Sequence, residues 1–579
     1  MLSLLLAFPL ASAQPMPVHL TLSKEGKPLL LRNNKPFLIR GAGGNGSLEL
    51  LAKAGGNAIR TWGVGPETTK ILDDAHQLNI AVAVGIWLGH QRHGFDYADP
   101  IQVQKQKEMA RQTVLKYKDH PAVLIWGVGN EMEGFEKGND PNVWNAVCEI
   151  ATMIKGLDPN HPIMTTTADI GGGRIAGVNS CDAIDIHGIN SYGGAPSLPT
   201  RYPDNGGRKP VILTEFGPPG TWEVGRNDFG ATLELSSTEK SNHYRDVWKD
   251  VIQTDPLFLG GFAFTWGAKV EATTTWFGMF LPDGTRLASV DTMAELWGRP
   301  FANKVPVVEQ GLQIKGSNKV APNATITATW KVTDPEQETL QTTWTLRREA
   351  LTYITGGDAQ AIPMDFPNAI KNKSTQKAQI NMPAGHGIYR LYAAVRDSNN
   401  GGATASIPIL VGSVPKKADP LPMPWNLYTG EGESGGPFLP TGRMGDVEDL
   451  TVDFDHNHNC HGPPTCIRTR FTNEGRWAGV VWQYPAENWG KHPGLNMANT
   501  EKVTFWVRSD FTGVKAKFGF GMEKIDTTSI TKTISIPTKW TKITLPIKGD
   551  KTSITSGFWF VLENAQQSTY LYLDDIVFE

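Results

Sequence analysis

The sequence predicts a multidomain protein in which a (β/α)8 TIM barrel precedes two β-sandwich domains. Three observations carry this prediction. The chain of 579 residues is too long for one hydrophobic core. Short apolar runs alternate with amphipathic, helix-length stretches from about residue 36 to 300. Beyond Arg299-Pro300 the helical periodicity ends, and alternating strand-like runs separated by Pro, Asn and Gly replace it.

The first residues, MLSLLLAFPLASAQ, form an apolar run followed by the small-residue triplet Ala11-Ser12-Ala13. This pattern is typical of a signal peptide over residues 1–13, although no Lys or Arg precedes Lys24. The alternative is a buried N-terminal strand. Because a membrane span needs about 20 apolar residues, the run is too short to cross a bilayer. We therefore expect a secreted or periplasmic protein that does not span a membrane.

The barrel is predicted over residues 14–302 from eight apolar runs that alternate with helical stretches. About 265 residues for eight units is close to the roughly 250 residues typical of this fold. An open, doubly wound sheet is the structural alternative, but it rarely has eight units, and no GxGxxG follows the first run. The runs are 36–44, 57–63, 80–90, 122–131, 162–169, 183–192, 210–217 and 260–267.

Two β-domains are predicted after the barrel. Residues 303–413 contain runs such as ATITATWKV and GIYRLYAAVRD, which indicate a sandwich of immunoglobulin or fibronectin type. Residues 414–424 are proline-rich and indicate a linker. From 425 to 579 the strand-like runs resume and predict a jelly roll.

The amino-acid composition indicates which kinds of binding partner to expect. The 58 acidic and 55 basic residues leave a net charge of −3, so nothing points to nucleic acid or to an anionic membrane. The 18 Trp residues are an excess. Trp rings stack on the apolar faces of sugars while the indole N–H donates a hydrogen bond, although many of these residues are also expected in the core.

The four cysteines allow two disulfides in an exported protein. Cys460 and Cys466 enclose a short loop that a disulfide could pin, whereas a pairing of Cys148 with Cys181 is only one option. Three histidines near the first pair raise the alternative of a zinc site, but their spacing favours a solvated loop. These histidines are His456, His458 and His461.

The catalytic prediction rests on two glutamates. In a TIM barrel the active site lies at the carboxyl ends of the strands. Glu131 ends the apolar run AVLIWGVGNE, and Glu215 ends PVILTE. Burying a charge is costly unless a partner or a function compensates for it. Glycoside cleavage needs one neutral carboxyl to protonate the leaving oxygen and one ionised carboxylate, and it needs no cofactor.

The neighbouring strand ends supply groups that suit these roles. Repulsion from Glu215 and burial should raise the pKa of Glu131 and keep it protonated. Arg60 and the Tyr192 hydroxyl could stabilise the Glu215 anion. Asn130 is suited to hydrogen-bond a sugar 2-hydroxyl in the transition state.

These residues resemble clan A of the glycoside hydrolases, whose barrels carry Asn-Glu at the end of the fourth strand and Glu at the end of the seventh. Counting the runs places Asn130-Glu131 fourth and Glu215 seventh. The matches continue with Arg60 on the second run, Tyr192 on the sixth and Trp266 on the eighth. The resemblance covers about residues 30–300. It implies a retaining double displacement, with Glu215 as nucleophile, Glu131 as acid/base and the two carboxyls about 5–5.5 Å apart.

Further residues near the strand ends are predicted to bind substrate. His187 could position substrate or lie in the barrel core, and His90 could bind substrate or be exposed in its loop. Glu133 is the alternative to Glu131 for the role of acid/base. Because Glu133 follows the strand end, we expect it to lie in a loop and to touch substrate. The aromatic residues that could stack on sugars, or else pack in the core, are Trp62, Trp87, Trp222 and Trp276.

A β-linked polysaccharide, above all a β-glucan, is the expected substrate. Motifs such as GGNAIRTWG and GINSY resemble both the clan branch of β-glucanases and β-glucanosyltransferases and the barrel of β-galactosidase-type enzymes. A β-glucan is preferred because only about twenty mature residues precede the first run, which leaves no room for the N-terminal sandwich of the β-galactosidase type. The alternatives are a transglycosylase with the same residues, a β-galactosidase or β-mannanase-type enzyme, and a non-catalytic carbohydrate-binding protein.

The C-terminal segment resembles galactose-binding-like carbohydrate-binding modules, through WAGVVWQYPAENWG, TFWVRS and YLDDIVFE. Each of its tryptophans could be a sugar platform or a core residue. Such modules often hold a structural Ca²⁺, for which Glu431, Glu433 and Asp575 supply oxygen ligands. The candidate sugar platforms are Trp477, Trp482 and Trp489.

Overall fold

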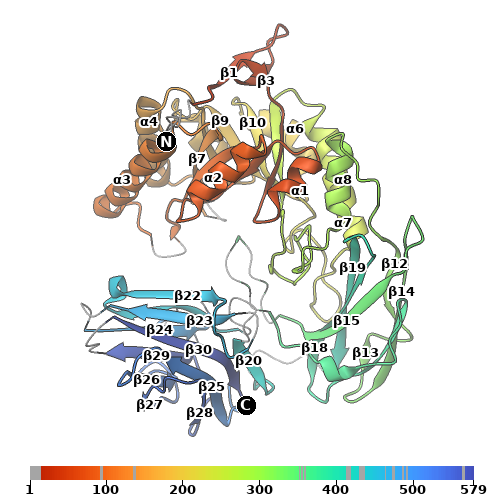
Figure 1. Cartoon of the computed structure of the whole chain (residues 1–579), viewed down its shortest axis with the longest axis vertical. Coiled ribbons are helices and arrows are strands. Elements are labelled where there is room, and N and C mark those ends of the chain that lie inside the picture. Colours follow the sequence, from red (N-terminus) through yellow and green to blue (C-terminus); the bar gives the residue numbers. More distant parts are fainter. Residues whose placement is uncertain are drawn as a thin grey trace, which may run out of the picture.

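The computed structural model folds into a barrel and two β-sandwiches that follow one another along the chain (Figure 1). The structure describes residues 15–579 except 92–94, 135–137, 351–352, 354–355, 358–359, 361, 413–418, 429–436, 463–464, 473–475, 486–487, 491–492 and 564–567. The predicted signal peptide over residues 1–13 therefore lies outside the described residues and stays a prediction.

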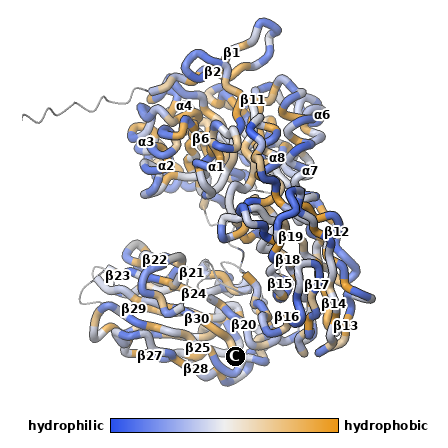
Figure 2. The backbone as a smooth tube through the Cα atoms, turned by 45° about the vertical axis from the view of Figure 1, so that its right-hand side comes forward, coloured by the Kyte–Doolittle hydropathy of each residue, from blue (hydrophilic) through white to orange (hydrophobic). Residues whose placement is uncertain are grey.

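Eight parallel strands close the barrel in the order β10-β11-β4-β5-β6-β7-β8-β9, so the predicted fold class is confirmed. Each strand falls within or overlaps one of the eight predicted runs. The strands are among the most hydrophobic segments of the chain (Figure 2), as expected for a parallel sheet that is buried on both faces. Their bounds are β4 Ile39–Gly43, β5 Ala58–Arg60, β6 Ala81–Ile86, β7 Val123–Asn130, β8 Ile163–Ala168, β9 Ile186–Asn190, β10 Val211–Phe216 and β11 Phe258–Phe264.

Helices connect the strands, and several begin at polar caps in the sequence. Asp99 and Asp140 each accept a backbone N–H at the start of a helix whose first residue is Pro. None of the helices among the described residues is long and apolar enough to cross a membrane. The helices are α1 Leu48–Lys53, α2 Thr68–Gln77, α3 Pro100–Tyr117, α4 Pro141–Leu157, α5 Arg174–Asn179, α6 Leu198–Asp204, α7 Ser237–Val247 and α8 Ala288–Leu296.

A small N-terminal sheet covers one end of the barrel. It consists of β1 (Val18–Leu22), β2 (Pro28–Arg32) and β3 (Lys35–Pro36). Val18 and Leu30 pack in one hydrophobic cluster with side chains that fill the barrel interior, including those of the first residues of several strands. The amino ends of the strands are therefore covered, and the carboxyl ends form the open end.

The second domain is a sandwich of two four-stranded sheets, ordered β12-β14-β17-β16 and β13-β19-β18-β15. Its strands alternate buried and exposed residues, as the period-2 pattern predicts. The bounds are β12 Val307–Ile314, β13 Lys319–Val320, β14 Thr325–Thr333, β15 Gln341–Arg348, β16 Ile370–Lys371, β17 Lys377–Asn381, β18 Gly387–Arg396 and β19 Gly402–Val411.

Buried charges join this sandwich to the barrel. Arg390, on β18, is fully buried and donates to Glu349 at 2.7 Å and to the barrel carbonyl of Thr232 at 2.9 Å. The barrel residue Glu234 lies 4.0 Å from Arg390 and pairs with Lys240 at 2.6 Å. A buried ion is tolerated only when it is paired, and here the partners come from both domains. Separating the domains would leave these charges unpaired, so the barrel and the second domain form one structural unit.

The C-terminal domain is a second sandwich, with sheets β22-β23-β30-β25-β28 and β21-β24-β29-β26-β27, while β20 pairs with β30. The bounds are β20 Trp425–Tyr428, β21 Leu439–Gly445, β22 Leu450–His456, β23 Cys466–Phe471, β24 Trp477–Gln483, β25 Lys502–Ser509, β26 Lys515–Phe520, β27 Ile530–Ser535, β28 Thr541–Pro546, β29 Ser556–Glu563 and β30 Thr569–Phe578.

The structure bears on the predicted sugar platforms and calcium ligands of this domain. Trp482 is fully buried in the core because alternate residues of β24 point inward, so the structure contradicts its proposed role as a sugar platform. Trp477 and Trp489 are partly exposed. Of the predicted calcium ligands, Glu431 and Glu433 lie outside the described residues. Asp575 accepts a hydrogen bond from His461 at 3.1 Å, and calcium there stays a prediction.

Both disulfides that the cysteines allow are formed. Cys460 and Cys466 close the short loop between β22 and β23. Cys148, on α4, bonds to Cys181, which follows α5, so this bridge ties two helical segments on the outside of the barrel. The second pairing depends on the three-dimensional proximity of these segments.

Candidate active site

Glu215 occupies the next-to-last position of β10 and is nearly buried at the open end of the barrel. Three donors surround its carboxylate. Arg60 Nη1 donates to Oε1 at 3.0 Å, and Trp62 Nε1 donates to the same oxygen at 2.8 Å. The Tyr192 hydroxyl donates to Oε2 at 2.6 Å. Charge-assisted hydrogen bonds of this kind favour the ionised carboxylate.

Arg60 links the ends of several strands. Its Nη2 donates to Asn130 Oδ1 at 2.6 Å, and its Nη1 also donates to the carbonyl of Thr214 at 3.0 Å. The guanidinium is buried, and its fork of donors fixes both the amide of Asn130 and the carboxylate of Glu215. The arginine therefore positions groups on β7 and β10 relative to one another.

Glu131 is the residue directly after β7, and its backbone has a φ of 51°. A left-handed conformation is uncommon for a residue other than Gly, and such outliers gather at functional sites. Asn190 Nδ2 donates to Glu131 Oε1 at 2.7 Å. Burial, followed by the negative charge of Glu215, raises the pKa of Glu131 to about 8. The carboxyl is therefore mostly protonated at neutral pH, as a general acid requires.

The Tyr192 hydroxyl remains protonated and can donate a hydrogen bond, because burial and the charge of Glu215 act on it as they act on Glu131. Burial and the adjacent charge of Glu215 raise the pKa of the Tyr192 phenol well above its usual value. The phenol therefore keeps its proton and donates it in a hydrogen bond to the Glu215 carboxylate. The site thus holds one neutral carboxyl, one carboxylate and fixed donors that face the carboxylate.

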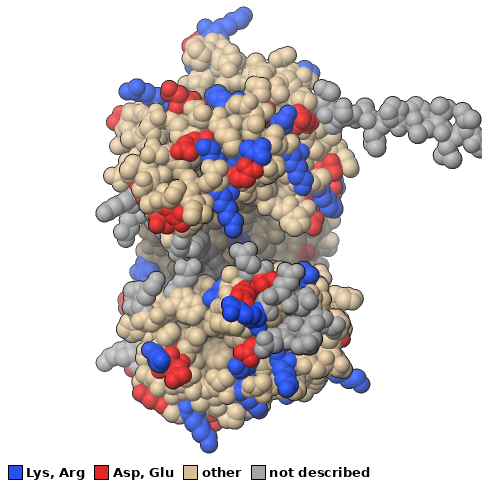
Figure 3. Space-filling model, turned by 90° about the vertical axis from the view of Figure 1, so that its left-hand side faces the viewer, with Lys and Arg blue, Asp and Glu red and all other residues tan. Residues whose placement is uncertain are grey.

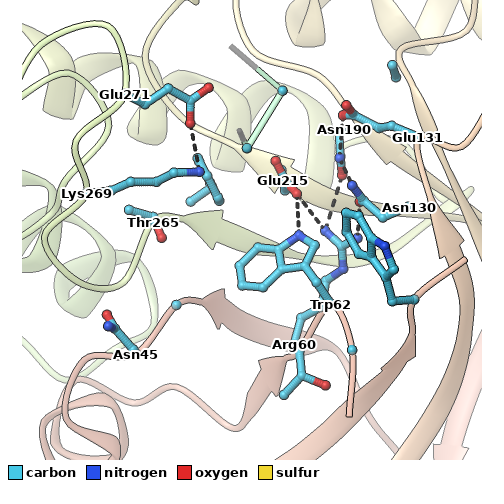
Figure 4. Close-up of a pocket in the computed structure, with 18 of the residues that line it drawn as sticks. Asn45, Arg60, Trp62, Asn130, Glu131, Asn190, Glu215, Thr265, Lys269 and Glu271 are labelled. Atoms are coloured by element: carbon cyan, nitrogen blue, oxygen red, sulfur yellow. Dashed lines mark hydrogen bonds and ion pairs between the residues drawn. The ribbon is translucent and has the colours of Figure 1, made fainter. Parts of the chain in front are cut away.

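Both glutamates line one pocket with a volume of about 1070 Å³ at the carboxyl ends of the strands. Figure 4 shows Glu215 between the Lys269–Glu271 pair on one side and Asn190 with Glu131 on the other. Aromatic side chains from a strand end and from several connecting segments line the pocket. These aromatic residues are Trp62, Trp87, Tyr192, Trp222 and Phe264.

Several predicted residues do lie at this pocket, and the structure brings them together from separate strands. Trp62 reaches Glu215 directly, whereas Trp87 and Trp222 are 39% and 55% exposed at the surface of the pocket. Exposed indole faces beside a pair of carboxyls are suited to stack on sugar rings.

Three predicted binding residues do not reach the pocket. His90 is buried and stacks on the Trp87 ring at a centroid distance of 4.6 Å, so it supports that ring instead of lining the pocket. His187 is buried in the barrel wall beside Thr167, and burial lowers its pKa to about 3. Trp266 is buried and donates to the carbonyl of Ser47. The chain turns after β11, so Phe264 takes the place in the pocket expected for Trp266.

Two further side chains have structural roles. Glu133 is buried and pairs with Arg174 at 2.8 Å, and its Oε1 accepts the N–H of Ala168. It does not line the pocket, which contradicts its expected contact with substrate. Trp276 is also buried, with its indole N–H donated to the carbonyl of Pro219.

Sequence reasoning missed the Lys269–Glu271 pair, which lines the pocket after β11. Burial raises the pKa of Glu271, while the neighbouring Lys269 opposes this effect. Gly356 and Gly357 of the second domain line the same pocket, so the sandwich contributes to the site. No strand-end motif marks these residues, because they come from a long connection and from another domain.

Comparison with known proteins agrees with this geometry. Residues 69–225 match the model of the glycosyl hydrolases family 2 TIM barrel domain. This segment includes the ends of β7, β9 and β10, with both Glu131 and Glu215. A curated relative, the probable mannan endo-1,4-beta-mannosidase C of Aspergillus terreus, is 33% identical over 85 residues, which cover 13% of this chain and 21% of the relative.

Solved structures of glycosidases align with larger parts of the chain. A β-glucuronidase of Bacteroides uniformis aligns over 96% of this chain and 67% of its own, with 13% identity and a TM-score of 0.38. An endo-β-1,4-mannanase of Thermotoga petrophila aligns over 66% of this chain and 99% of its own, with 14% identity and a TM-score of 0.33. The family match and the strand-end residues together show that the barrel of this chain is similar to the TIM barrels of glycosyl hydrolases of family 2.

Proposed function

We propose that this chain is a retaining glycoside hydrolase of β-linked polysaccharides, with Glu215 as nucleophile and Glu131 as acid/base. The observation that carries the proposal is the asymmetry of the two carboxyls. Glu215 accepts hydrogen bonds from Arg60, Trp62 and Tyr192, which favour its anion. Glu131 is raised in pKa to about 8 and is mostly protonated at neutral pH. A carboxyl that can give a proton, beside a second carboxyl held by three hydrogen-bond donors, is what glycoside cleavage requires.

In the first step a Glu215 oxygen attacks the anomeric carbon while the bond from this carbon to the leaving oxygen breaks. Glu131 gives its proton to that oxygen, which departs as a hydroxyl group. The covalent ester that results has no negative charge on Glu215, so the repulsion that raises the pKa of Glu131 is removed. Glu131 can then take a proton from water, and the resulting attack at the anomeric carbon releases Glu215 as a carboxylate.

The size and lining of the pocket favour an oligosaccharide over a single sugar. A volume of about 1070 Å³ lies just above the roughly 300–1,000 Å³ typical of small-molecule sites. Trp87 and Trp222 supply exposed rings, and the surface is hollowed between the barrel and the C-terminal sandwich (Figure 3). We take β-glucan as the first substrate to test and β-mannan as the second, because the curated relative is a probable mannosidase.

Product analysis tests this proposal. Full-length protein is incubated with β-1,3-, β-1,4-, β-1,6- and β-1,2-glucans, β-mannan and aryl β-glycosides, and the products are identified by mass spectrometry and NMR. We expect shorter β-linked products whose new reducing ends first appear as the β-anomer. Products longer than the substrate would indicate a transglycosylase instead. First release of the α-anomer would contradict the retaining mechanism, and binding without any product would indicate a non-catalytic protein.

The pKa of Glu131 sets a pH dependence. Since the acid must be protonated in the free enzyme, kcat/KM should fall as the pH rises through about 8. The profile is measured on the best polysaccharide substrate with full-length protein. With an aryl glycoside whose leaving group needs no protonation, the first chemical step should lose this alkaline decline. An unchanged rate on the polysaccharide up to pH 10 would contradict the assignment of Glu131 as the acid.

Export and glycan binding are parts of the same proposal. The two disulfides support a secreted or periplasmic location, because such bonds persist in oxidising compartments. Trp477 and Trp489 are the exposed aromatic candidates for glycan binding on the C-terminal domain. A second binding site on one chain would raise the local concentration of the barrel on a polymer.

A further inference from the structure

Three carboxylates gather at one end of the second domain, away from the catalytic pocket. Asp334 and Glu338 belong to the connection between β14 and β15, and Asp397 begins the turn between β18 and β19. One carboxylate oxygen from each residue lies within 4.8 Å of those of the other two. Oxygens bound to a single Ca²⁺ at about 2.4 Å can be at most about 4.8 Å apart, so the spacing fits one ion.

One carboxylate oxygen of each aspartate accepts hydrogen bonds from the backbone of its own turn. Asp334 Oδ1 accepts the backbone N–H groups of Glu336 and Glu338, at 3.0 and 2.9 Å. Asp397 Oδ1 accepts those of Asn399 and Gly401, both at 2.7 Å. The second oxygen of each carboxylate is thereby left for another partner.

The second carboxylate oxygens of Asp334 and Asp397 are buried and have no hydrogen-bond partner among the described residues. Asp334 is only 9% exposed, and its Oδ2 has no hydrogen-bond partner among the described residues. The same holds for Asp397 Oδ2 within the described part of the chain. A buried carboxylate oxygen without a donor or a counter-charge carries a desolvation cost, and a second carboxylate nearby adds repulsion.

Within the described part of the chain, no basic side chain forms an ion pair with these carboxylates. Among the ion pairs of the described residues, none involves Asp334, Glu338 or Asp397. In the part of the chain that the structure describes, the side-chain donors to Glu338 are all neutral: Ser398 Oγ at 2.9 Å, the Asn399 amide, and Asn303 Nδ2 at 3.2 Å. The cluster therefore has three acidic groups, two buried oxygens without a hydrogen-bond partner among the described residues, and no direct ion pair there, which is the environment of a cation site.

We propose that Asp334, Glu338 and Asp397 bind one Ca²⁺ at the junction of the second domain with the barrel. The donor set contains only oxygen, which suits a hard cation, whereas Zn²⁺ prefers nitrogen and sulfur ligands. Ligands from two irregular turns match the flexible coordination of Ca²⁺ better than the strict octahedron of Mg²⁺. Waters would complete the coordination shell.

The position of the site gives the ion a structural role. The barrel residue Arg286 donates through Nη1 to the carbonyl of Asn399 at 2.8 Å, and its backbone N–H donates to the carbonyl of Asn400 at 3.0 Å. Gly402 N–H donates back to the carbonyl of Arg286 at 2.9 Å. The turn that carries Asp397 is therefore also the turn that holds the barrel, and an ion there would stabilise the contact between the two domains.

Calcium titration of the full-length protein tests this inference. Protein stripped with EGTA is titrated with CaCl₂ by calorimetry, and thermal unfolding is followed with and without Ca²⁺. We expect saturable binding at this site and a rise in Tm of roughly 3 °C or more. Mg²⁺ should produce a clearly smaller rise at the same concentration. The absence of binding up to about 10 mM Ca²⁺, or an equal response to Mg²⁺, would overturn the assignment.

Variants separate this site from any ion elsewhere in the chain. Asp334→Asn and Asp397→Asn keep the Oδ1 acceptor of each turn but remove charge, and they should weaken this binding at least tenfold and abolish the rise in Tm. Without Ca²⁺ their Tm should equal or exceed that of the stripped wild type, because repulsion is relieved. Glu309→Gln, on the same domain and paired with Lys331, should bind Ca²⁺ as the wild type does. Undiminished Ca²⁺ binding by both Asp variants would place the ion elsewhere and refute the site.

Discussion

Glu215→Ala is expected to lower kcat by roughly four orders of magnitude or more on every substrate, activated or not. The substitution removes the oxygen that forms the covalent bond, and no leaving group can compensate for this loss. It also leaves Arg60, Trp62 and Tyr192 without their common acceptor. Initial rates on a polysaccharide and on an aryl glycoside with a good leaving group measure the effect. Added azide should restore turnover and give the α-glycosyl azide, because azide attacks from the vacated side.

Glu131→Ala provides the contrast that assigns the roles. It should lose far less activity in the first step on the activated aryl glycoside than on the polysaccharide, because only the help of the acid becomes dispensable. Equal losses for both variants on both substrates would refute the assignment. Glu149→Gln is a suitable control, since Glu149 pairs with Lys107 on the surface and lies outside the pocket. Its activity should match that of the wild type.

Arg390→Met is expected to destabilise the unit of barrel and second domain by about 3–5 kcal/mol, because it leaves buried carboxylates without their cation. Arg390 is fully buried between Glu349 of its own domain and Glu234 of the barrel. Thermal and denaturant unfolding of the full-length protein measure the loss. Activity should also fall, since Gly356 and Gly357 of this domain line the catalytic pocket.

Arg396→Met is the matched control on the same strand. Arg396 also pairs across the domain junction, with Asp283 at 2.7 Å, but both side chains are about a third to a half exposed. Pairs of this kind contribute at most about 1 kcal/mol, because solvent screens them. If both variants lost the same stability, burial of the charge would not explain the effect at Arg390.

The dependence of the pocket on two domains alters how the chain should be divided. A fragment that ends near residue 302 would expose Glu234 without Arg390, its partner in the second domain. It would also lose the glycines that line the pocket. The barrel and the first sandwich are therefore the smallest unit on which catalysis should be measured, and the C-terminal domain is the part to remove when glycan binding is tested.

The sequence alone determined the barrel and its two glutamates. Apolar runs with helical stretches between them are a local signal, and each run became a strand because a parallel strand is buried on both faces. Once the strands are counted, the geometry of the barrel brings their carboxyl ends together. Glu131 and Glu215, at the ends of the fourth and seventh runs, were therefore predictable as neighbours without any coordinates.

Only the tertiary structure decided which side chains near those ends enter the pocket. His90, His187 and Trp266 share a position in the sequence pattern with Trp62 and Tyr192, yet their side chains pack away from the open end. The orientation of a residue beyond a strand end depends on how its loop turns and on what packs against it. The contribution of Gly356, the Cys148–Cys181 bond and the carboxylate cluster at Asp334 all join segments far apart in the chain, and no local pattern encodes such contacts.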